Sequence, residues 1–196
     1  MKQDTQIHQH YKEGDSLFSP FSKEKSVFEI AEGYVTASTF DDDGKKRIHL
    51  IYGPGSYFPV LTTFSGGEQR ATYEALTVVT VTKRSRENFL ELLDNDAKFC
   101  RAILAKTVDQ LTLFADRVID LQMTKLIDQL QLKLSMLAKD HGRLRNGYTR
   151  LPYKLKHHHI ADMLGVERES ISRALGKLKS QGFLRISKDG YIEIRA

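Results

Sequence analysis

Residues 155–180 read LKHHHIADMLGVERESISRALGKLKS, and this stretch decides the fold of the C-terminal part of the chain. Apolar residues at helical spacing precede Gly165, with Ile160, Ala161 and Leu164 on one face, and a second such pattern follows it. Glycine gives the backbone the freedom that a tight turn between two helices needs. The stretch therefore predicts a helix-turn-helix, a motif whose second helix lies in the major groove of DNA.

The second predicted helix has a polar face made of residue types that can read bases. Residues four apart on a helix share a face, so Glu169 and Arg173 stand side by side, with Arg168 and Ser172 next to them. Arginine can donate two hydrogen bonds to guanine, and glutamate can accept one from cytosine N4. An amphipathic helix pair with a charged outer face is also common in helical proteins that bind no DNA. Periodicity alone therefore leaves both interpretations open.

Two further observations favour DNA binding. Strand-like runs at residues 182–186 and 191–194 flank Lys188-Asp189-Gly190, a hairpin turn, so a wing is predicted directly after the second helix. Residues 151–196 hold nine Lys and Arg against five Asp and Glu, whereas residues 1–150 hold 21 against 20. The excess positive charge thus belongs to the segment that would meet phosphate.

The N-terminal part has the pattern of a small β structure. Short strand-like runs separated by glycine-containing turns occupy residues 8–82, and the best of them are 17–18, 27–30, 34–40, 48–52 and 78–81. Many short strands with regular turns predict a β-roll or barrel. The three aspartates at 41–43 precede Gly44 and indicate an exposed hairpin tip rather than a cation site.

From Ser85 the hydrophobic period becomes helical. A short helix is predicted over residues 85–93 with Ser85 as its cap, and Asp94 or Asn95 is expected to cap the next helix. Residues 96–121 contain no Pro or Gly and predict one long helix with two apolar faces. One face, which includes Ile103, would cover the roll.

The other face of the long helix has the spacing that suits pairing with a second copy of the chain. It carries Leu104, Val108, Leu111, Ala115 and Val118. A buried helix in a monomer is the alternative. A further amphipathic helix is predicted over residues 125–140, and a polar loop over residues 141–147.

Composition limits the class of protein. The chain has 40% hydrophobic and 28% charged residues with a net charge of +5, which suits a soluble globular protein. No apolar run approaches the roughly 18 residues of a membrane span, and the polar N-terminus does not match a signal peptide. We therefore expect a cytoplasmic protein with no membrane partner. The single Cys100 cannot form an internal disulfide.

The order and spacing of these motifs resemble the Crp/Fnr superfamily of bacterial transcription regulators over essentially the whole chain. The glycines near residues 14, 33, 44 and 53–55 fall where that family places those of its cyclic-nucleotide-type β-roll, and residues 164–173 match its helix-turn-helix. The resemblance implies an α+β fold. It consists of a β-roll sensor domain of double-stranded jelly-roll type (residues 1–94), a dimerisation helix (95–123) and a winged helix-turn-helix (124–196).

The resemblance also implies a homodimer on a palindromic, TGA-containing DNA site, with recognition helices about one DNA turn, ~34 Å, apart. Base edges would be read by Arg168, Glu169 and Arg173. The other expected DNA contacts are Ser170, Ser172 and Lys177 on the same helix, and Lys156, His158 and Lys188 toward phosphate. RNA polymerase is an expected partner, with residues 141–147 as the candidate surface.

The sensor half departs from the family's pattern. Its cyclic-AMP-binding members carry Gly-Glu, which holds the ribose, and later Arg-Ser or Arg-Thr, which meets the cyclic phosphate. Here the first pair is Pro59-Val60 and the second is Arg70-Ala71, with Thr72 one place late. Cyclic AMP is therefore not expected as effector. Two alternatives remain: another small effector in a pocket near these residues, Phe58 and Phe114, or a constitutive regulator with a ligand-free roll.

Other chemistry is not expected. The N-terminal cysteine cluster of Fnr is missing, which excludes an iron–sulfur cluster within one chain. Haem stays open as a minor alternative through His8, His10 and His49. The consecutive histidines at 157–159 cannot converge on one metal ion, because helical neighbours point ~100° apart. A cupin-like metal enzyme is the alternative class, whose sites resemble a His-x-His followed by Glu and a later His on strands. His8-Gln9-His10 is expected to precede the roll, and no such set follows it. We therefore assign no catalytic residue, no metal site and no certain cofactor.

Overall fold

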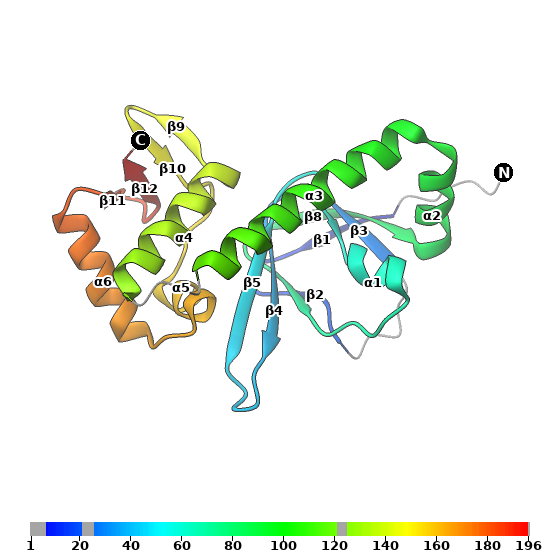
Figure 1. Cartoon of the computed structure of the whole chain (residues 1–196). Coiled ribbons are helices and arrows are strands. Elements are labelled where there is room, and N and C mark those ends of the chain that lie inside the picture. The colour runs from blue at the N-terminus through cyan, green and yellow to red at the C-terminus, as the bar shows by residue number, and fades with distance from the viewer. Residues whose placement is uncertain (1–6, 21–25, 121–124, 196) are drawn as a thin grey trace. The chain divides into compact units, whose positions relative to one another are not determined.

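The computed structural model describes residues 7–20, 26–120 and 125–195, apart from the side chains of residues 113, 114 and 116–120. The described residues form two compact units, a β-rich N-terminal unit and a mostly helical C-terminal unit (Figure 1). The predicted α+β class is confirmed. None of the described helices combines the length and the apolar character needed to cross a bilayer.

The described strands of the N-terminal unit form two four-stranded sheets. One has the order β1-β8-β3-β6 and the other the order β2-β7-β4-β5. The strands are β1 (Ile7–Tyr11), β2 (Ser16–Phe18), β3 (Ser26–Glu32), β4 (Val35–Phe40), β5 (Lys46–Tyr52), β6 (Tyr57–Phe58), β7 (Thr72–Ala75) and β8 (Val79–Ser85). Of these, β1, β6 and β7 were not among the predicted runs, because each is short or carries polar residues at most positions.

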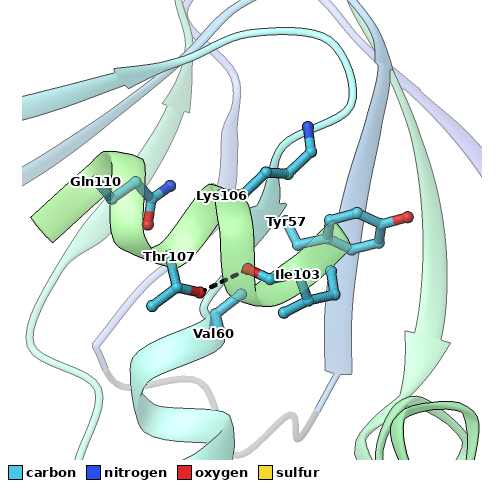
Figure 2. Close-up of a pocket in the computed structure, with 6 residues that line it drawn as sticks. All are labelled: Tyr57, Val60, Ile103, Lys106, Thr107 and Gln110. Atoms are coloured by element: carbon cyan, nitrogen blue, oxygen red, sulfur yellow. Dashed lines mark hydrogen bonds between the residues drawn. The ribbon is translucent and has the colours of Figure 1, made fainter. Parts of the chain in front are cut away.

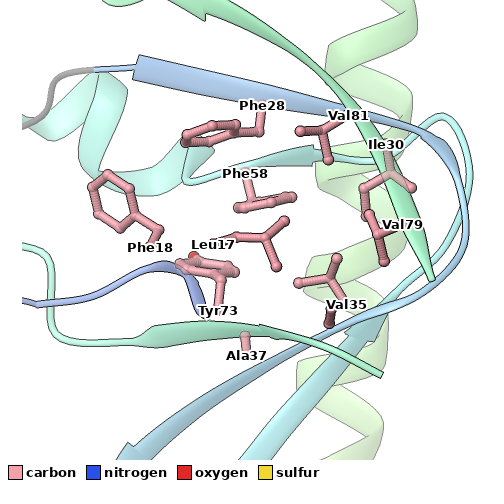
Figure 3. Close-up of a cluster of buried hydrophobic side chains, with 11 residues drawn as sticks. Leu17, Phe18, Phe28, Ile30, Val35, Ala37, Phe58, Tyr73, Val79 and Val81 are labelled. Carbon is pink, nitrogen blue, oxygen red and sulfur yellow. The ribbon is translucent and has the colours of Figure 1, made fainter. Parts of the chain in front are cut away.

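The space between the two sheets is filled by aromatic and aliphatic side chains (Figure 3). Phe58 is fully buried, and its ring stacks on Tyr73 at a centroid distance of 4.6 Å and on Phe28 at 5.4 Å. Val79 and Val81 from β8 close the same cluster. This core explains the predicted β-roll: alternate residues of each strand point inward and bury apolar surface.

Three helices accompany the strands of the roll. Helix α1 (Val60–Ser65) lies between β6 and β7 in the chain, and α2 (Arg86–Asn95) and α3 (Ala97–Asp120) follow β8. The Oγ of Ser85 accepts the N–H of Asn88 at 3.1 Å, which confirms the predicted cap of α2. The cap of α3 is Asp96, whose Oδ1 accepts the N–H groups of Lys98 and Phe99. The prediction of Asp94 or Asn95 is wrong because α2 continues through Asn95.

A second, smaller core fixes α2 and α3 against the roll. It consists of Val27 from β3, Phe89 from α2 and Ile103 from α3, each at most 4% exposed. Tyr57 and Phe99 pack around it, with their ring centroids 5.7 Å apart. The first apolar face of the long helix therefore covers the roll, as predicted.

The C-terminal unit combines helices with a sheet of order β11-β12-β10-β9. Its elements are α4 (Leu126–His141), β9 (Arg143–Arg145), β10 (Tyr148–Arg150), α5 (His157–Leu164), α6 (Arg168–Ser180), β11 (Leu184–Ile186) and β12 (Ile192–Arg195). The prediction of a loop over residues 141–147 is corrected, because β9 and a tight turn at Asn146-Gly147 form a hairpin with β10. All three β9 side chains are exposed, so no apolar alternation marked this strand.

Candidate nucleic-acid interface

The turn between α5 and α6 is built around Gly165. This residue has a φ of 71°, a left-handed conformation, and its N–H donates to the carbonyl of Ala161 at 2.8 Å. The N–H of Val166 donates to the same carbonyl at 3.2 Å. Because residues with a Cβ rarely adopt positive φ, glycine lets α5 stop and the chain turn at once into α6. Ile160 and Ile171 are buried where the two helices meet.

Helix α6 separates a buried face from an exposed polar face. Ile171, Leu175 and Leu178 are at most 3% exposed. The exposed side carries Arg168, Glu169, Ser172, Arg173 and Lys177. Ser170 is half-buried, and its Oγ accepts a hydrogen bond of 3.4 Å from Nη2 of Arg173. The side chains predicted to read bases are thus accessible, and the helix that carries them is anchored by its apolar face.

The three histidines at the start of α5 have different surroundings. His157 is half-buried, with Nδ1 2.7 Å from Oγ of Ser172 on α6. His159 is also half-buried, and its Nδ1 accepts the backbone N–H of Lys156 at 3.3 Å. His158 is exposed. Within the described ranges, no set of three or more His, Cys, Asp or Glu side chains is arranged to hold a metal ion.

The wing is the hairpin of β11 and β12, and a charged cluster ties it to β10. Glu193 is only 7% exposed, and its carboxylate lies 2.6 Å from Nε of Arg185 and 3.7 Å from Nη1 of Arg150. The Arg150 guanidinium also lies 4.0 Å over the ring of Tyr191. A buried carboxylate between two guanidinium groups is well compensated, so the hairpin is held rigidly against the sheet.

The tip of the wing is part of the same cluster. Asp189 accepts a hydrogen bond of 2.5 Å from Nη2 of Arg150. The hydroxyl of Ser187, and next the guanidinium of Arg150, lower the pKa of Asp189 to about 2. Lys188, which lies between Ser187 and Asp189 in the sequence, is exposed. The other predicted phosphate-binding residues, Lys156 and His158, are exposed as well, and so is Lys177 on α6.

The residues predicted to form an effector pocket differ in their surroundings. Phe58 is part of the aromatic core between the sheets (Figure 3), and Pro59 is buried beside it in sequence. Arg70 is exposed, while Ala71 and Thr72 are half-buried. The side chain of Phe114, the remaining member, lies outside the described residues.

A hollow open to solvent lies between the end of β6, the start of α1 and helix α3, and its volume is about 200 Å³ with the open solvent included (Figure 2). It is lined by Tyr57, Val60, Ile103, Lys106, Thr107 and Gln110. The hydroxyl of Thr107 donates to the carbonyl of Ile103 at 2.9 Å, which leaves Lys106 and Gln110 as the main polar groups for a guest.

Comparison with known proteins agrees with this geometry in both units. Residues 8–96 match the family described as cyclic nucleotide-binding domain, and residues 118–196 match the Crp-like helix-turn-helix domain. The chain belongs to the Crp/Fnr superfamily of transcription regulators. This confirms the resemblance inferred from the sequence.

Individual members of the Crp/Fnr superfamily are similar over most of their length. The cyclic AMP receptor protein of Thermus thermophilus is 24% identical, over 94% of this chain and 82% of its own. The CRP-like cAMP-activated global transcriptional regulator of Mycobacterium tuberculosis is 22% identical, over 88% of this chain and 77% of its own. The structure of FixK2 from Bradyrhizobium japonicum has a TM-score of 0.81 at 23% identity and covers 97% of this chain and 93% of that chain.

Sequence reasoning missed several contacts that shape the surface of α6 and the wing in this Crp/Fnr regulator. Arg150 and Glu193 organise the wing and were not singled out, and His157, weighed only with its neighbours as a metal ligand, contacts Ser172. The alternation of Tyr148 with Arg150 and of Tyr191 with Glu193 was a signal of paired strands. The partners themselves could not be read, because each contact joins different elements of the fold: Arg150 and Asp189 are 39 positions apart, and His157 and Ser172 are 15.

Helix α3 of the Crp/Fnr regulator leaves an apolar stripe uncovered. Leu104 is 61% exposed, Val108 52% and Leu111 67%, whereas Ile103 on the neighbouring face is 4% exposed. Exposed large apolar side chains in a row are unusual on a monomer surface. The stripe coincides with the part of the predicted pairing face whose side chains are described; Val118 lies beyond them.

Proposed function

We propose that the chain recognises a palindromic, TGA-containing DNA site as a homodimer and so regulates transcription in the cytoplasm. The observation that carries this proposal is the division of α6 into an anchored apolar face and an exposed polar face. Arg168, Glu169 and Arg173 would meet base edges from that exposed face. Ser170 and Ser172 lie among them and would add contacts to bases or phosphates.

Phosphate contacts would come from basic residues around this helix. Lys156 and His158 lie at the start of α5, Lys177 in α6 and Lys188 at the wing tip, and all four are exposed. Cations spread over three elements would follow the sugar–phosphate backbone on both sides of the groove, which fixes the register without selecting sequence. Each such contact also makes the affinity fall as salt rises.

The homodimer is supported by the exposed stripe of Leu104, Val108 and Leu111 on α3. The 4-3 spacing of these residues suits packing against the same stripe of a second chain. A two-fold pair would present two copies of α6, which a palindromic site requires.

A contact with RNA polymerase is proposed for the β9–β10 hairpin. Its first strand, β9, exposes Leu144, at 72%, between Arg143 and Arg145. An exposed apolar side chain flanked by two cations is suited to a partner surface with acidic groups around an apolar patch.

For the sensor half, we propose control by a small effector other than cyclic AMP. Pro59-Val60 replaces the ribose-binding carboxylate, and Arg70 is exposed. A constitutive regulator with a ligand-free roll is the second candidate, favoured by the complete burial of Phe58 in the core. Isothermal titration with cyclic AMP should release no heat, and micromolar binding would contradict both versions.

The regulator itself is tested by fluorescence anisotropy with two duplexes, a TGA palindrome and a scrambled sequence of the same composition. At about 0.15 M salt the palindrome should bind roughly 10³-fold more tightly or better. Equal affinities for the two duplexes, or a stoichiometry of one chain per palindrome, would contradict the proposal.

A further inference from the structure

A histidine at the start of α5 touches the recognition helix. Nδ1 of His157 lies 2.7 Å from Oγ of Ser172, which is a hydrogen bond between side chains 15 positions apart. Ser172 is exposed on the polar face of α6, next to Arg168 and Arg173. The half-buried imidazole thus contacts a group within the surface that the proposed function assigns to base reading.

The direction of this hydrogen bond decides what Ser172 can offer to DNA. A hydroxyl has one proton and two lone pairs. When the hydroxyl donates its proton in a hydrogen bond to Nδ1, only its lone pairs remain. Ser172 can then accept a hydrogen bond from the N6 amino group of adenine or the N4 amino group of cytosine. When Nδ1 carries a proton instead, the hydroxyl is free to donate to guanine O6 or N7, or to thymine O4.

The other ring nitrogen determines which direction is used. In neutral imidazole one nitrogen donates and the other accepts, and the partner of one nitrogen fixes the role of the other. Ser172 is the hydrogen-bond partner that the described chain offers to His157. His157 lies between Lys156 and His158, which are both exposed, at the start of a helix, where the helix dipole also favours anions. A DNA phosphate that approaches these residues would accept a hydrogen bond from Nε2–H.

We propose that His157 couples a phosphate contact to base selection. This inference rests on the proposed function. Nε2–H of His157 donates a hydrogen bond to a phosphate, so Nδ1 carries no proton and accepts a hydrogen bond from the hydroxyl of Ser172. Oγ of Ser172 then accepts a hydrogen bond from an adenine or cytosine amino group. His157 is a positioning residue for Ser172, and the pair selects an amino-bearing base at one position of each half-site.

Two substitutions of His157 distinguish the roles of its two ring nitrogens. His157→Asn places an amide oxygen near the position of Nδ1 but does not reach as far as Nε2. His157→Gln extends an amide N–H to about the reach of Nε2 but leaves no acceptor for Ser172. Ser172→Ala removes the base contact itself and serves as the reference for the position that the pair selects.

The experiment is a selection from duplex pools in which each half-site position is randomised, at about pH 8, where an ordinary imidazole is uncharged. The wild-type protein should enrich adenine or cytosine about fivefold, the effect of one hydrogen bond, at a position where Ser172→Ala enriches nothing. His157→Gln should lose the same enrichment and keep the wild-type affinity for a scrambled duplex. His157→Asn should keep the enrichment and bind every duplex about fivefold more weakly per half-site, because it loses one uncharged hydrogen bond to phosphate.

Base preferences at the positions that depend on Arg173 report folding within the same selection, since a misfolded variant would lose them all. The inference is overturned if His157→Gln enriches the same bases as the wild type, or if the position set by Ser172 selects guanine or thymine. It is also overturned if Ser172→Ala alters no position. A wild-type protein that enriches no sequence at all would instead contradict the proposed function.

Discussion

Arg150 in β10 reaches across the wing to Asp189, with Nη2 2.5 Å from Oδ2. The same guanidinium covers the ring of Tyr191, so it joins the turn of the hairpin to the body of the sheet. Lys188 precedes Asp189 directly in the chain. The position of this proposed phosphate contact is therefore fixed by a residue that need not touch DNA.

The charge on Asp189 should persist into strong acid. Its pKa lies at about 2, below the ordinary 3.8, because the Ser187 hydroxyl and the Arg150 guanidinium stabilise the carboxylate. A lowered pKa stabilises the folded wing above about pH 4, and that contribution is lost as the pH falls toward 2. Carboxyl carbon NMR should show the midpoint near 2. Ser187→Ala should raise the midpoint more than Arg150→Met, and a wild-type midpoint near the ordinary value would contradict the assignment.

Arg173→Ala should remove sequence selectivity while leaving general DNA binding. Arg173 is exposed on the polar face of α6, and a bidentate arginine–guanine pair is worth about 1–3 kcal/mol of discrimination. The ratio of affinities for palindrome and scrambled duplex should fall by that amount per half-site in anisotropy titrations. Lys179→Ala, which removes an exposed cation elsewhere on the same helix, is the control and should preserve the ratio. An unchanged ratio in Arg173→Ala would rule out its base-reading role.

Lys188→Ala should weaken all duplexes alike. Loss of one phosphate contact lowers the slope of log affinity against log salt by about one per half-site, without a change in base preference. Affinities measured over a salt series give that slope directly. Lys139→Ala, at an exposed position late in α4, should leave the slope unaltered. A selective loss for the palindrome would show that Lys188 reads sequence instead.

Leu111→Asp should dissociate the proposed homodimer. The side chain is 67% exposed in the isolated chain, so the substitution costs little there, whereas a carboxylate buried in a paired interface is strongly unfavourable. Sedimentation velocity should show a monomer at concentrations where the wild type is a dimer. Ala102→Asp places the same charge on an exposed position nearly opposite the stripe and should remain dimeric. A dimeric Leu111→Asp protein would locate the interface elsewhere.

Phe58→Ala should destabilise the β-roll by about 3–5 kcal/mol, because it removes a buried ring between Tyr73 and Phe28. Phe40, at 59% exposure, provides the matched control, and Phe40→Ala should cost less than about 1 kcal/mol. Urea unfolding followed by circular dichroism measures both. A small effect at Phe58 would indicate that this ring lines an accessible pocket rather than the core.

The elements with a regular apolar period were predictable from the sequence. Gly165 between two helical patterns predicted the helix-turn-helix, and the 4-3 spacing from Leu104 to Leu111 predicted an uncovered face on the long helix. Both features are local, since each is encoded within about two dozen consecutive residues. Strand β9 was missed because its exposed side chains give no such period.

The parts that depend on contacts between distant segments could not be predicted. Phe58 follows the glycines at residues 53–55, where a ligand contact was expected, but it stacks between Phe28 and Tyr73. No pattern in the sequence indicates those neighbours. The bond between His157 and Ser172 depends on the crossing of α5 and α6. Side-chain partners of this kind follow from tertiary packing rather than from propensity or spacing.

The apolar stripe on α3 has a consequence for gene dosage. If pairing is needed to bind a palindrome, then at low expression the number of competent pairs follows the square of the chain concentration. Halving synthesis would lower promoter occupancy about fourfold by mass action. The regulator would thus respond steeply to its own abundance, and a cell could switch its targets through protein synthesis and degradation without any signalling molecule.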